Sequence, residues 1–175
     1  GFFSRLERGR AWVRMKLAAS LDGATALANG VSQWITSPEA RADGHAWRAR
    51  AGAILTGMGT VLQGDPRLDV RHAPVHHQPP LALVDSRLEL PVDARLFLPG
   101  RPLWIYTAQA DDPKATVLRE RGAEVITLPG PSGKVDLAAM LQDLARREVN
   151  ELHVEAGFKL NGSLVREGLV DEFLV

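Results

Sequence analysis

The segment Trp12-Val-Arg-Met-Lys-Leu-Ala-Ala19 predicts a β-strand, because Val13, Met15 and Leu17 fall on one face with a period of two. The chain then continues as Ser20-Leu-Asp-Gly23, so a lysine, a serine, an aspartate and a glycine gather around the exit of this strand. Polar groups at this density are unusual at the end of a buried strand. They indicate a ligand site.

Two ordinary interpretations compete with that ligand site. Lys16 has apolar neighbours, where a charge needs a partner or a ligand, but a lysine at a sheet edge can also extend its ammonium group to solvent. Asp22-Gly23 fits a common tight turn as well as a binding loop. These residues by themselves leave both interpretations open.

The rest of the chain alternates predicted strands and helices. Short apolar runs predict strands at residues 53–56, 81–84, 103–106, 124–128, 152–155 and 172–175. Capping and periodicity predict helices at residues 36–50, 113–121 and 136–147, and a short helix that follows the turn 156–162 and runs through residue 167. Repeated strand–helix units favour a largely parallel sheet with helices on both faces. In such folds, ligands bind beyond the carboxyl ends of the strands.

The 36–50 helix begins with a capping signal, either Thr36 with Glu39 or Ser37 followed by Pro38. Its spacing predicts a buried stripe of Ala40, Gly44, Trp47 and Ala51, beside a polar face of Arg41, His45 and Arg48.

Composition limits the possible function classes. A chain of 175 residues, 45% of them apolar, fits a single domain with a real core. The 21 basic residues equal the 21 acidic ones, so no global field favours nucleic acid or an anionic membrane. The lack of cysteine excludes disulfides, thiolate zinc sites and cysteine nucleophiles and is typical of a cytoplasmic protein. No apolar run approaches the roughly 20 residues that a membrane-spanning helix needs.

Two glycine-containing turns are candidate phosphate sites. Gly57-Met-Gly-Thr60 follows a predicted strand, and its N–H groups could hold a phosphate, although the motif by itself is weak and a tight turn is its commoner explanation. Glu155-Ala-Gly-Phe-Lys-Leu-Asn-Gly162 places a carboxylate and then glycines before a helix, an arrangement that suits a pyrophosphate. The alternative is a plain strand-to-helix turn with Glu155 in solvent.

Single residues add weaker signals. Arg48 and Arg71 could each bind a substrate phosphate, since the guanidinium fork matches its oxygens. Histidines at 72, 76 and 77 lack partners at metal-site spacing, so no metal is predicted. The absence of a G-x-S-x-G elbow leaves acyl transfer without support.

Taken in order, these motifs resemble the reductase domain of the bifunctional riboflavin-biosynthesis deaminase-reductase. The resemblance covers essentially the whole chain and rests on an ordered set of motifs rather than on any single one. The set is Lys16-Leu-Ala-Ala-Ser-Leu-Asp-Gly23, Ser32-Gln-Trp-Ile-Thr36, Arg48-Ala49, Ile54-Leu-Thr-Gly-Met-Gly-Thr-Val61, Asp65-Pro66, Leu68, Arg71, Val84-Asp85-Ser86, Val154-Glu-Ala-Gly157 and Leu169-Val-Asp-Glu172. The opening Gly1-Phe-Phe-Ser-Arg resembles the junction that follows the deaminase domain in bifunctional members.

The resemblance implies a fold, a reaction and an assembly. The fold is α/β, a dihydrofolate-reductase-like three-layer sandwich with a mostly parallel central sheet. The reaction is NADPH-dependent reduction of 5-amino-6-(5-phosphoribosylamino)uracil to the ribitylamino compound, with hydride delivered to C1′ of an opened, imine-like ribosyl group. The expected assembly is a homodimer, with a deaminase domain fused to it in the native protein. Residues 1–175 are expected to form one reductase domain without the deaminase's zinc ligands.

The resemblance also assigns site residues. It implies a catalytic pocket completed by Lys16, Asp22 and Glu155. It implies that the substrate is bound by Ser32, Arg48, Leu68, Arg71 and Glu155. It implies that the cofactor is bound by Ala18, Trp34, Thr60, Ser86, Gly157, Phe158, Lys159, Leu160, Asn161, Gly162 and Ser163.

Two departures from the family pattern keep alternatives open. Members often carry two acidic residues before the proline at 66, whereas this chain has Gly64-Asp65. The family sheet continues with further strands, so the chain is expected to be truncated at its C-terminus. The alternatives are another reductase of the same fold acting on a pterin or folate-like substrate, and a non-catalytic nucleotide-binding or dimerisation domain.

Overall fold

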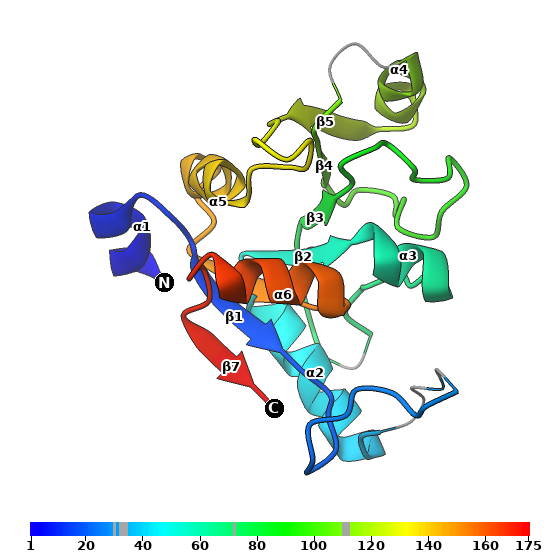
Figure 1. Cartoon of the computed structure of the whole chain (residues 1–175), viewed down its shortest axis with the longest axis vertical. Coiled ribbons are helices and arrows are strands. Elements are labelled where there is room, and N and C mark those ends of the chain that lie inside the picture. The colour runs from blue at the N-terminus through cyan, green and yellow to red at the C-terminus, as the bar shows by residue number, and fades with distance from the viewer. Residues whose placement is uncertain (30, 32–34, 72, 110–112) are drawn as a thin grey trace.

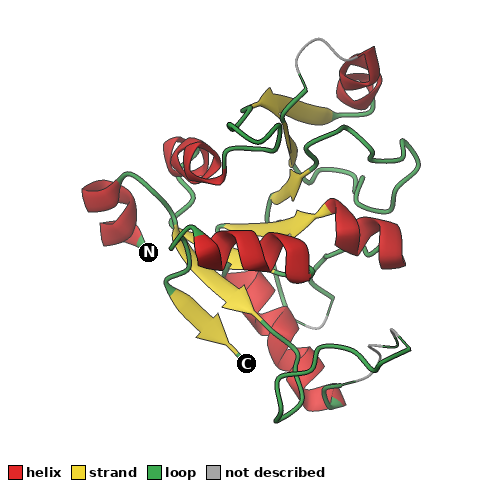
Figure 2. Cartoon of the chain, viewed as in Figure 1, coloured by secondary structure: helices red, strands yellow, loops and turns green. Residues whose placement is uncertain are grey.

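The computed structural model describes residues 1–29, 31, 35–71, 73–109 and 113–175 (Figure 1). In sheet order the strands are β5 (Ala123–Thr127), β4 (Leu103–Thr107), β3 (Leu81–Val84), β2 (Ala53–Gly57), β6 (Glu151–Val154), β1 (Trp12–Lys16) and β7 (Glu172–Leu174). The helices are α1 (Phe2–Arg8), α2 (Pro38–Arg50), α3 (Met58–Gly64), α4 (Pro113–Glu120), α5 (Leu137–Arg146) and α6 (Phe158–Arg166) (Figure 2). Every neighbouring strand pair is parallel. The prediction of a mostly parallel α/β sheet is confirmed, and none of these strand pairs is antiparallel.

The strand order explains why helices cover both faces. The chain moves in one direction along the sheet from β1 to β2, β3, β4 and β5, and then returns to β6 and β7. Parallel crossovers share one hand, so reversing direction moves the connecting helix to the other face. The helices α5 and α6 accordingly lie opposite α2 in Figure 1. The predicted three layers are present.

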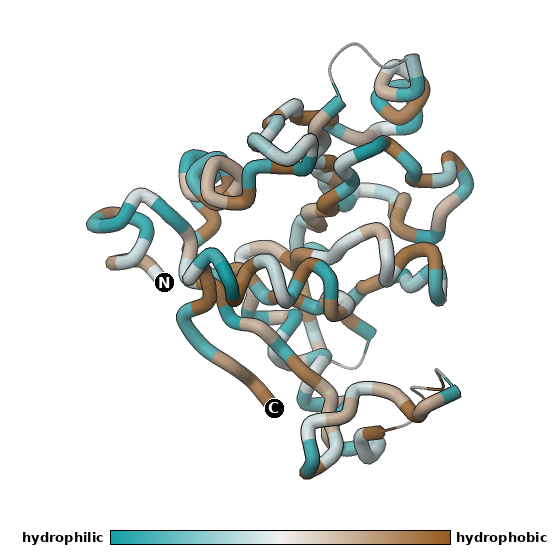
Figure 3. Tube along the Cα trace, in the orientation of Figure 1, coloured by the Kyte–Doolittle hydropathy of each residue, from teal (hydrophilic) through white to brown (hydrophobic). Residues whose placement is uncertain are grey.

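Two apolar clusters pack against the two faces. One joins Met140 and Leu141 of α5 and Leu164 of α6 to strand residues that include Val13. The other joins Met58 of α3 and the α4 residues Ala115 and Leu118 to the opposite faces of β2 to β5. Figure 3 shows the matching alternation of apolar and polar colour along α6. The period-two pattern of the strands therefore divides the core as the sequence predicts.

Helix α2 corrects one prediction, because its buried face differs from the expected stripe. Its buried residue is His45, whereas Ala40 is exposed and Gly44 only half-buried. The Trp47 ring lies between two guanidinium groups, with Arg14 at 4.4 Å and Arg50 at 4.6 Å from its centroid. The physical reason is the sheet beneath: its face there bears Arg14 and His153, so a polar helix face is the one that matches it.

Three further elements differ from expectation. Helix α1 has no local sequence signal, and the first strand ends at Lys16 rather than at residue 19. Helix α6 begins at Phe158, inside the segment expected to be a turn, because Gly157 is its N-cap. Ser37 is the N-cap of α2 and accepts a hydrogen bond from the Ala40 N–H, which decides between the two capping signals. Within the described residues, no helix has the length and apolar character needed to cross a membrane.

Candidate functional site

The centre of the site is an ion pair between Arg48 of α2 and Glu155, which directly follows β6. The guanidinium contacts the carboxylate at two points, Nε to Oε1 and Nη2 to Oε2, the second at 2.8 Å. Both side chains are largely buried, with about 15% of each exposed. Such a two-point pair fixes the plane of the carboxylate as well as its charge.

Strand geometry places Glu155 at this point. Its N–H donates to the Leu55 carbonyl at 2.9 Å, and its own carbonyl accepts from Thr56 Oγ1 at 2.8 Å. These bonds extend the pairing of β6 with β2 by one residue. His153, two residues earlier on the same face, brings Nε2 to 3.4 Å from Glu155 Oε1. The carboxylate is thereby held beyond the end of its strand.

The surroundings of Glu155 keep it charged. Burial opposes ionisation, but the hydrogen bonds and positive charge of Arg48, with His153, outweigh it and hold the pKa of Glu155 well below its usual range. Burial also opposes the charge on Arg48, yet Glu155 and Asp69 raise the pKa of Arg48 above its usual value. At neutral pH the pair is a cation beside an anion, and Glu155 acts as a hydrogen-bond acceptor.

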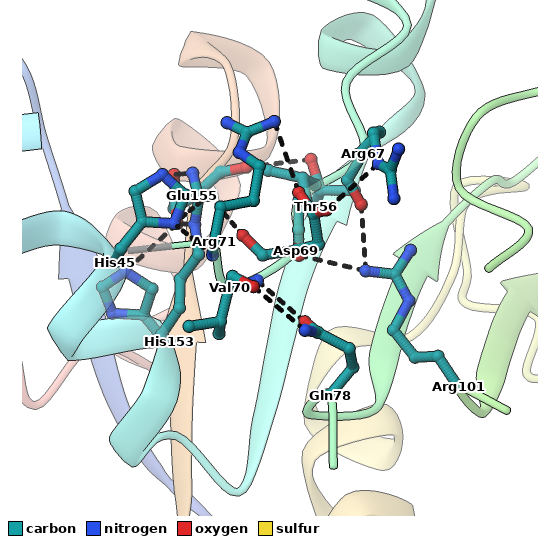
Figure 4. A network of polar contacts seen from close by, with 12 residues as sticks. His45, Thr56, Arg67, Asp69, Val70, Arg71, Gln78, Arg101, His153 and Glu155 are labelled. Carbon is teal, nitrogen blue, oxygen red and sulfur yellow. Dashed lines mark hydrogen bonds and ion pairs between the residues drawn. The ribbon is translucent and has the colours of Figure 1, made fainter. Parts of the chain in front are cut away.

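A loop after α3 brings the other expected substrate residues to this pair (Figure 4). Arg48 Nη1 donates to the Asp69 carbonyl at 3.0 Å, and the Arg71 N–H donates to His45 Nδ1 at 3.3 Å. Leu68 is buried, whereas 52% of the Arg71 side chain is exposed. The structure therefore brings the backbone of the 68–71 loop to the Arg48–Glu155 pair. The Leu68 side chain packs in the second apolar cluster, and Arg71 Nη1 lies 3.4 Å from Asp69 Oδ1.

Lys16 and Asp22 have different positions. Met15 of β1 pairs with Val154 of β6. Lys16 and Glu155 are the next residues of these two neighbouring parallel strands, so they follow the same pair at the carboxyl end of the sheet. Asp22 lies in an exposed loop, where its carboxylate accepts a hydrogen bond from Ser20 Oγ. That bond lowers the pKa of Asp22. Lys16 thus borders the buried pair, and Asp22 is in the solvent-exposed loop beyond it.

The expected cofactor residues meet where α3 and α6 begin. A Cβ on Gly157 would lie 3.7 Å from Thr60 Oγ1, and one on Gly57 would lie 3.2 Å from Leu160 Cδ2. Gly157 is the N-cap of α6 and supplies no side-chain cap, so the first-turn N–H groups are available to an anion. The buried side-chain oxygen of Asn161 lacks a hydrogen-bond partner among the described residues. The N–H donors fit the phosphates of a cofactor, whereas the Asn161 oxygen is an acceptor that suits a hydroxyl or an N–H group.

The remaining cofactor candidates are spread around this point. Phe158 and Lys159 are exposed on the first turn of α6, and Gly162 and Ser163 follow on the same helix. Ser86 follows β3, and its Oγ accepts from the Val135 N–H at 3.2 Å. Ala18 is half-buried just beyond β1. Ser32 and Trp34 lie outside the described residues.

Sheet topology explains why this edge holds the site. The connection after β2 leads to α3, on the face of the second apolar cluster, and the one after the neighbouring β6 leads to α6, on the other face. Ligands in open parallel sheets bind where neighbouring connections diverge in this way. Sequence reasoning missed His45, Thr56, Asp69 and His153, because each contributes through contacts between elements rather than through a motif.

Fold and site together define an α/β protein with an all-parallel sheet and a largely buried ion pair at the carboxyl ends of its central strands. The chain belongs to the RibD C-terminal domain family, whose profile matches residues 11–175. This confirms the family to which the ordered motifs pointed.

Individual relatives agree with that assignment. The riboflavin biosynthesis protein RibD of Escherichia coli K12 is 39% identical over 190 residues, covering 100% of this chain and 50% of the relative. The solved structure of Acinetobacter baumannii RibD matches with a TM-score of 0.82 at 32% identity, over 98% of this chain and 47% of the other. The structure of Saccharomyces cerevisiae riboflavin biosynthesis reductase Rib7 matches with a TM-score of 0.68 at 20% identity, over 94% of this chain and 71% of Rib7. At that identity the match supports the dihydrofolate-reductase-like fold alone. The chain spans about half the length of the curated relatives that it matches.

Proposed function

We propose that this domain reduces 5-amino-6-(5-phosphoribosylamino)uracil to 5-amino-6-(5-phosphoribitylamino)uracil with NADPH, in riboflavin biosynthesis. The observation that carries the proposal is the buried Arg48–Glu155 pair directly after β6, two residues before Gly157, where α6 begins and where an added Cβ would lie 3.7 Å from Thr60 Oγ1. Family membership supports it. A Thermotoga maritima homologue of the same fold is described as a deaminase/5-amino-6-(5-phosphoribosylamino)uracil reductase.

On the substrate side, each residue has a role that suits its surroundings. Glu155 accepts a hydrogen bond from a substrate hydroxyl or N–H, and Arg48 fixes the direction of that carboxylate. Arg71, with its half-exposed guanidinium, binds the phosphate, and Leu68 and Ser32 complete the substrate pocket. Lys16 hydrogen-bonds a ribose hydroxyl or a ring carbonyl.

On the cofactor side, the first turn of α6 holds the pyrophosphate, with Thr60, Ser86, Ala18 and Trp34 around it. When bound, the dihydronicotinamide supplies a hydride to C1′ of the opened ribosyl group, and a proton on the neighbouring nitrogen completes the reduction. The chain's contribution is to align the two ligands and exclude water, because hydride transfer requires close contact between them. Asp22 joins the catalytic pocket from the exposed loop after β1.

The test is NADPH consumption followed at the nicotinamide absorbance band. Turnover with the deaminated pyrimidine phosphate and none with dihydrofolate supports the proposal, whereas the opposite pattern overturns it. NADPH fluorescence on mixing tests the alternative of a non-catalytic domain, which a lack of NADPH binding at high concentration would favour.

Homodimerisation belongs to the same proposal. β7 is an edge strand of the sheet in the described residues, and Phe173 on it is 54% exposed. An unpaired strand edge with apolar side chains favours pairing with another chain. Light scattering on the purified domain tests this, and a mass that stays monomeric at high concentration would contradict it.

A further inference from the structure

The loop that carries Leu68 and Arg71 has a backbone that would not hold its shape unaided. Leu68 has φ of 49° and Asp65, at the end of α3, has φ of 36°. Residues other than glycine rarely adopt this left-handed backbone conformation, and it persists only where surrounding contacts enforce it. The contacts that enforce this loop are therefore functional candidates.

Arg101 supplies one set of these contacts. It precedes β4, is buried, and donates through Nη1 to the carbonyls of Arg67 and Leu68 at 2.9 and 3.0 Å. Its Nη2 donates to the Leu96 carbonyl at 2.6 Å. Burial lowers the pKa of Arg101 to about 10, which leaves it charged at neutral pH. One cation thus fixes the carbonyls on both sides of the left-handed turn.

Gln78 supplies the second set. Its Oε1 accepts from the Val70 N–H at 2.7 Å, and its Nε2 donates to the Val70 carbonyl at 3.0 Å. One side-chain amide therefore pairs with both backbone groups of Val70, as a neighbouring strand would. Figure 4 shows Gln78 and Arg101 approaching the loop from the side away from His45 and Glu155.

We propose that Arg101 and Gln78 are positioning residues that hold the Leu68–Arg71 loop in its substrate-binding shape. They act through the backbone, so that the Leu68 backbone and the Arg71 side chain face the substrate, while the Leu68 side chain packs in the second apolar cluster and Arg101 and Gln78 stay behind the loop. This inference rests on the proposed function, because it assigns Leu68 and Arg71 to the substrate. It predicts that loss of either contact weakens substrate binding but spares the cofactor.

The experiment uses Arg101→Met and Gln78→Met, which remove these hydrogen bonds and leave an unbranched apolar side chain, of similar length to the original at position 78 and shorter at position 101. The matched control is Asp143→Asn, which disturbs the partly buried Tyr106–Asp143 bond on the face of the sheet opposite the Leu68 cluster. Amide hydrogen exchange is measured at residues 68–71, together with KM for the pyrimidine phosphate and KM for NADPH. Binding of ribose 5-phosphate serves as a probe that needs no turnover.

Both variants are expected to speed exchange of the Val70 amide and to raise the substrate KM about tenfold, with the NADPH KM changed less than about twofold. Arg101→Lys, which keeps the charge and one donor, is expected to recover part of the loss. Unchanged exchange and KM would overturn the proposal, as would equal changes in Asp143→Asn. If the parent protein lacks turnover, the proposed function fails; exchange and ribose 5-phosphate binding then still decide whether the two residues hold a binding loop.

Discussion

At the scale of single residues, the charge of Glu155 decides what it can do. A carboxylate held by Arg48 and kept ionised by it is a poor proton donor at neutral pH and a well-oriented acceptor. General acid catalysis needs a pKa near the working pH, and Glu155 is far from that condition. Its proposed part in the reaction is therefore to orient the substrate.

Replacement of Glu155 tests that role. Glu155→Gln keeps the shape but leaves Arg48 without its anion, so we expect the free energy of unfolding to fall by about 2–3 kcal/mol and the substrate KM to rise. Chemical denaturation and steady-state kinetics measure the two effects. Arg48→Lys is the paired control, because it keeps the charge and loses the two-point geometry. A Glu155→Gln variant with unaltered KM would remove Glu155 from the substrate site.

The same ion pair predicts a pH dependence of stability. The pKa of Glu155 is lower in the folded protein than in the unfolded chain, so the unfolded state binds more protons as pH falls. The stabilisation is complete above the ordinary glutamate pKa of about 4.3 and is lost progressively below it. Urea unfolding between neutral pH and acid should show this slope, and Glu155→Gln should flatten it. An equally steep slope in the variant would assign the effect to other carboxylates.

At the scale of elements, Asp171 explains how the first helix is attached. Its carboxylate accepts from Arg8 and Arg10 and from the Val13 N–H, with closest distances of 2.8 Å. One side chain between α6 and β7 therefore ties α1 to β1. The Leu169-Val-Asp-Glu172 motif, which contributed to the family resemblance, therefore has a structural role: its aspartate attaches α1 to β1.

Asp171→Ala is expected to lower the free energy of unfolding by about 1–3 kcal/mol, since it leaves a nearly buried N–H and two arginines without their acceptor. Thermal and urea unfolding measure the loss. Asp171→Asn retains part of the acceptor capacity, so its free energy of unfolding should lie between those of the parent protein and Asp171→Ala. A fully stable alanine variant would show that α1 is attached by its other contacts.

Strands and amphipathic helices could be predicted because period-two runs and caps are local signals, as Val13 and Met15 in β1 and Asp136 at the start of α5 illustrate. Helix α1 could not, because contacts distant in sequence, such as Arg5 with Asn150, hold its seven residues. The buried side of α2 depends on Arg14 and His153 beneath it, which helical spacing cannot reveal. The positions of Arg101 and Gln78 depend on tertiary contacts for the same reason.

At the scale of the whole molecule, the return of the chain from β5 to β6 creates the site. β6 lies between β1 and β2, so its carboxyl end is flanked by the ends of two strands that precede it in the sequence. Lys16 and Glu155 follow the ends of neighbouring strands there although they are far apart in sequence. Arg48 joins them from the helix that links β1 to β2.

Isotope transfer from the cofactor is the sharpest test of the proposed reduction. NADPH deuterated at C4 of the nicotinamide, prepared separately as each of the two stereoisomers, is incubated with the protein and 5-amino-6-(5-phosphoribosylamino)uracil, and the product is examined by mass spectrometry and NMR. We expect one of the two isomers to place deuterium on C1′ of the ribityl chain. A product without deuterium from either isomer, or with deuterium on the pyrimidine ring, would contradict it.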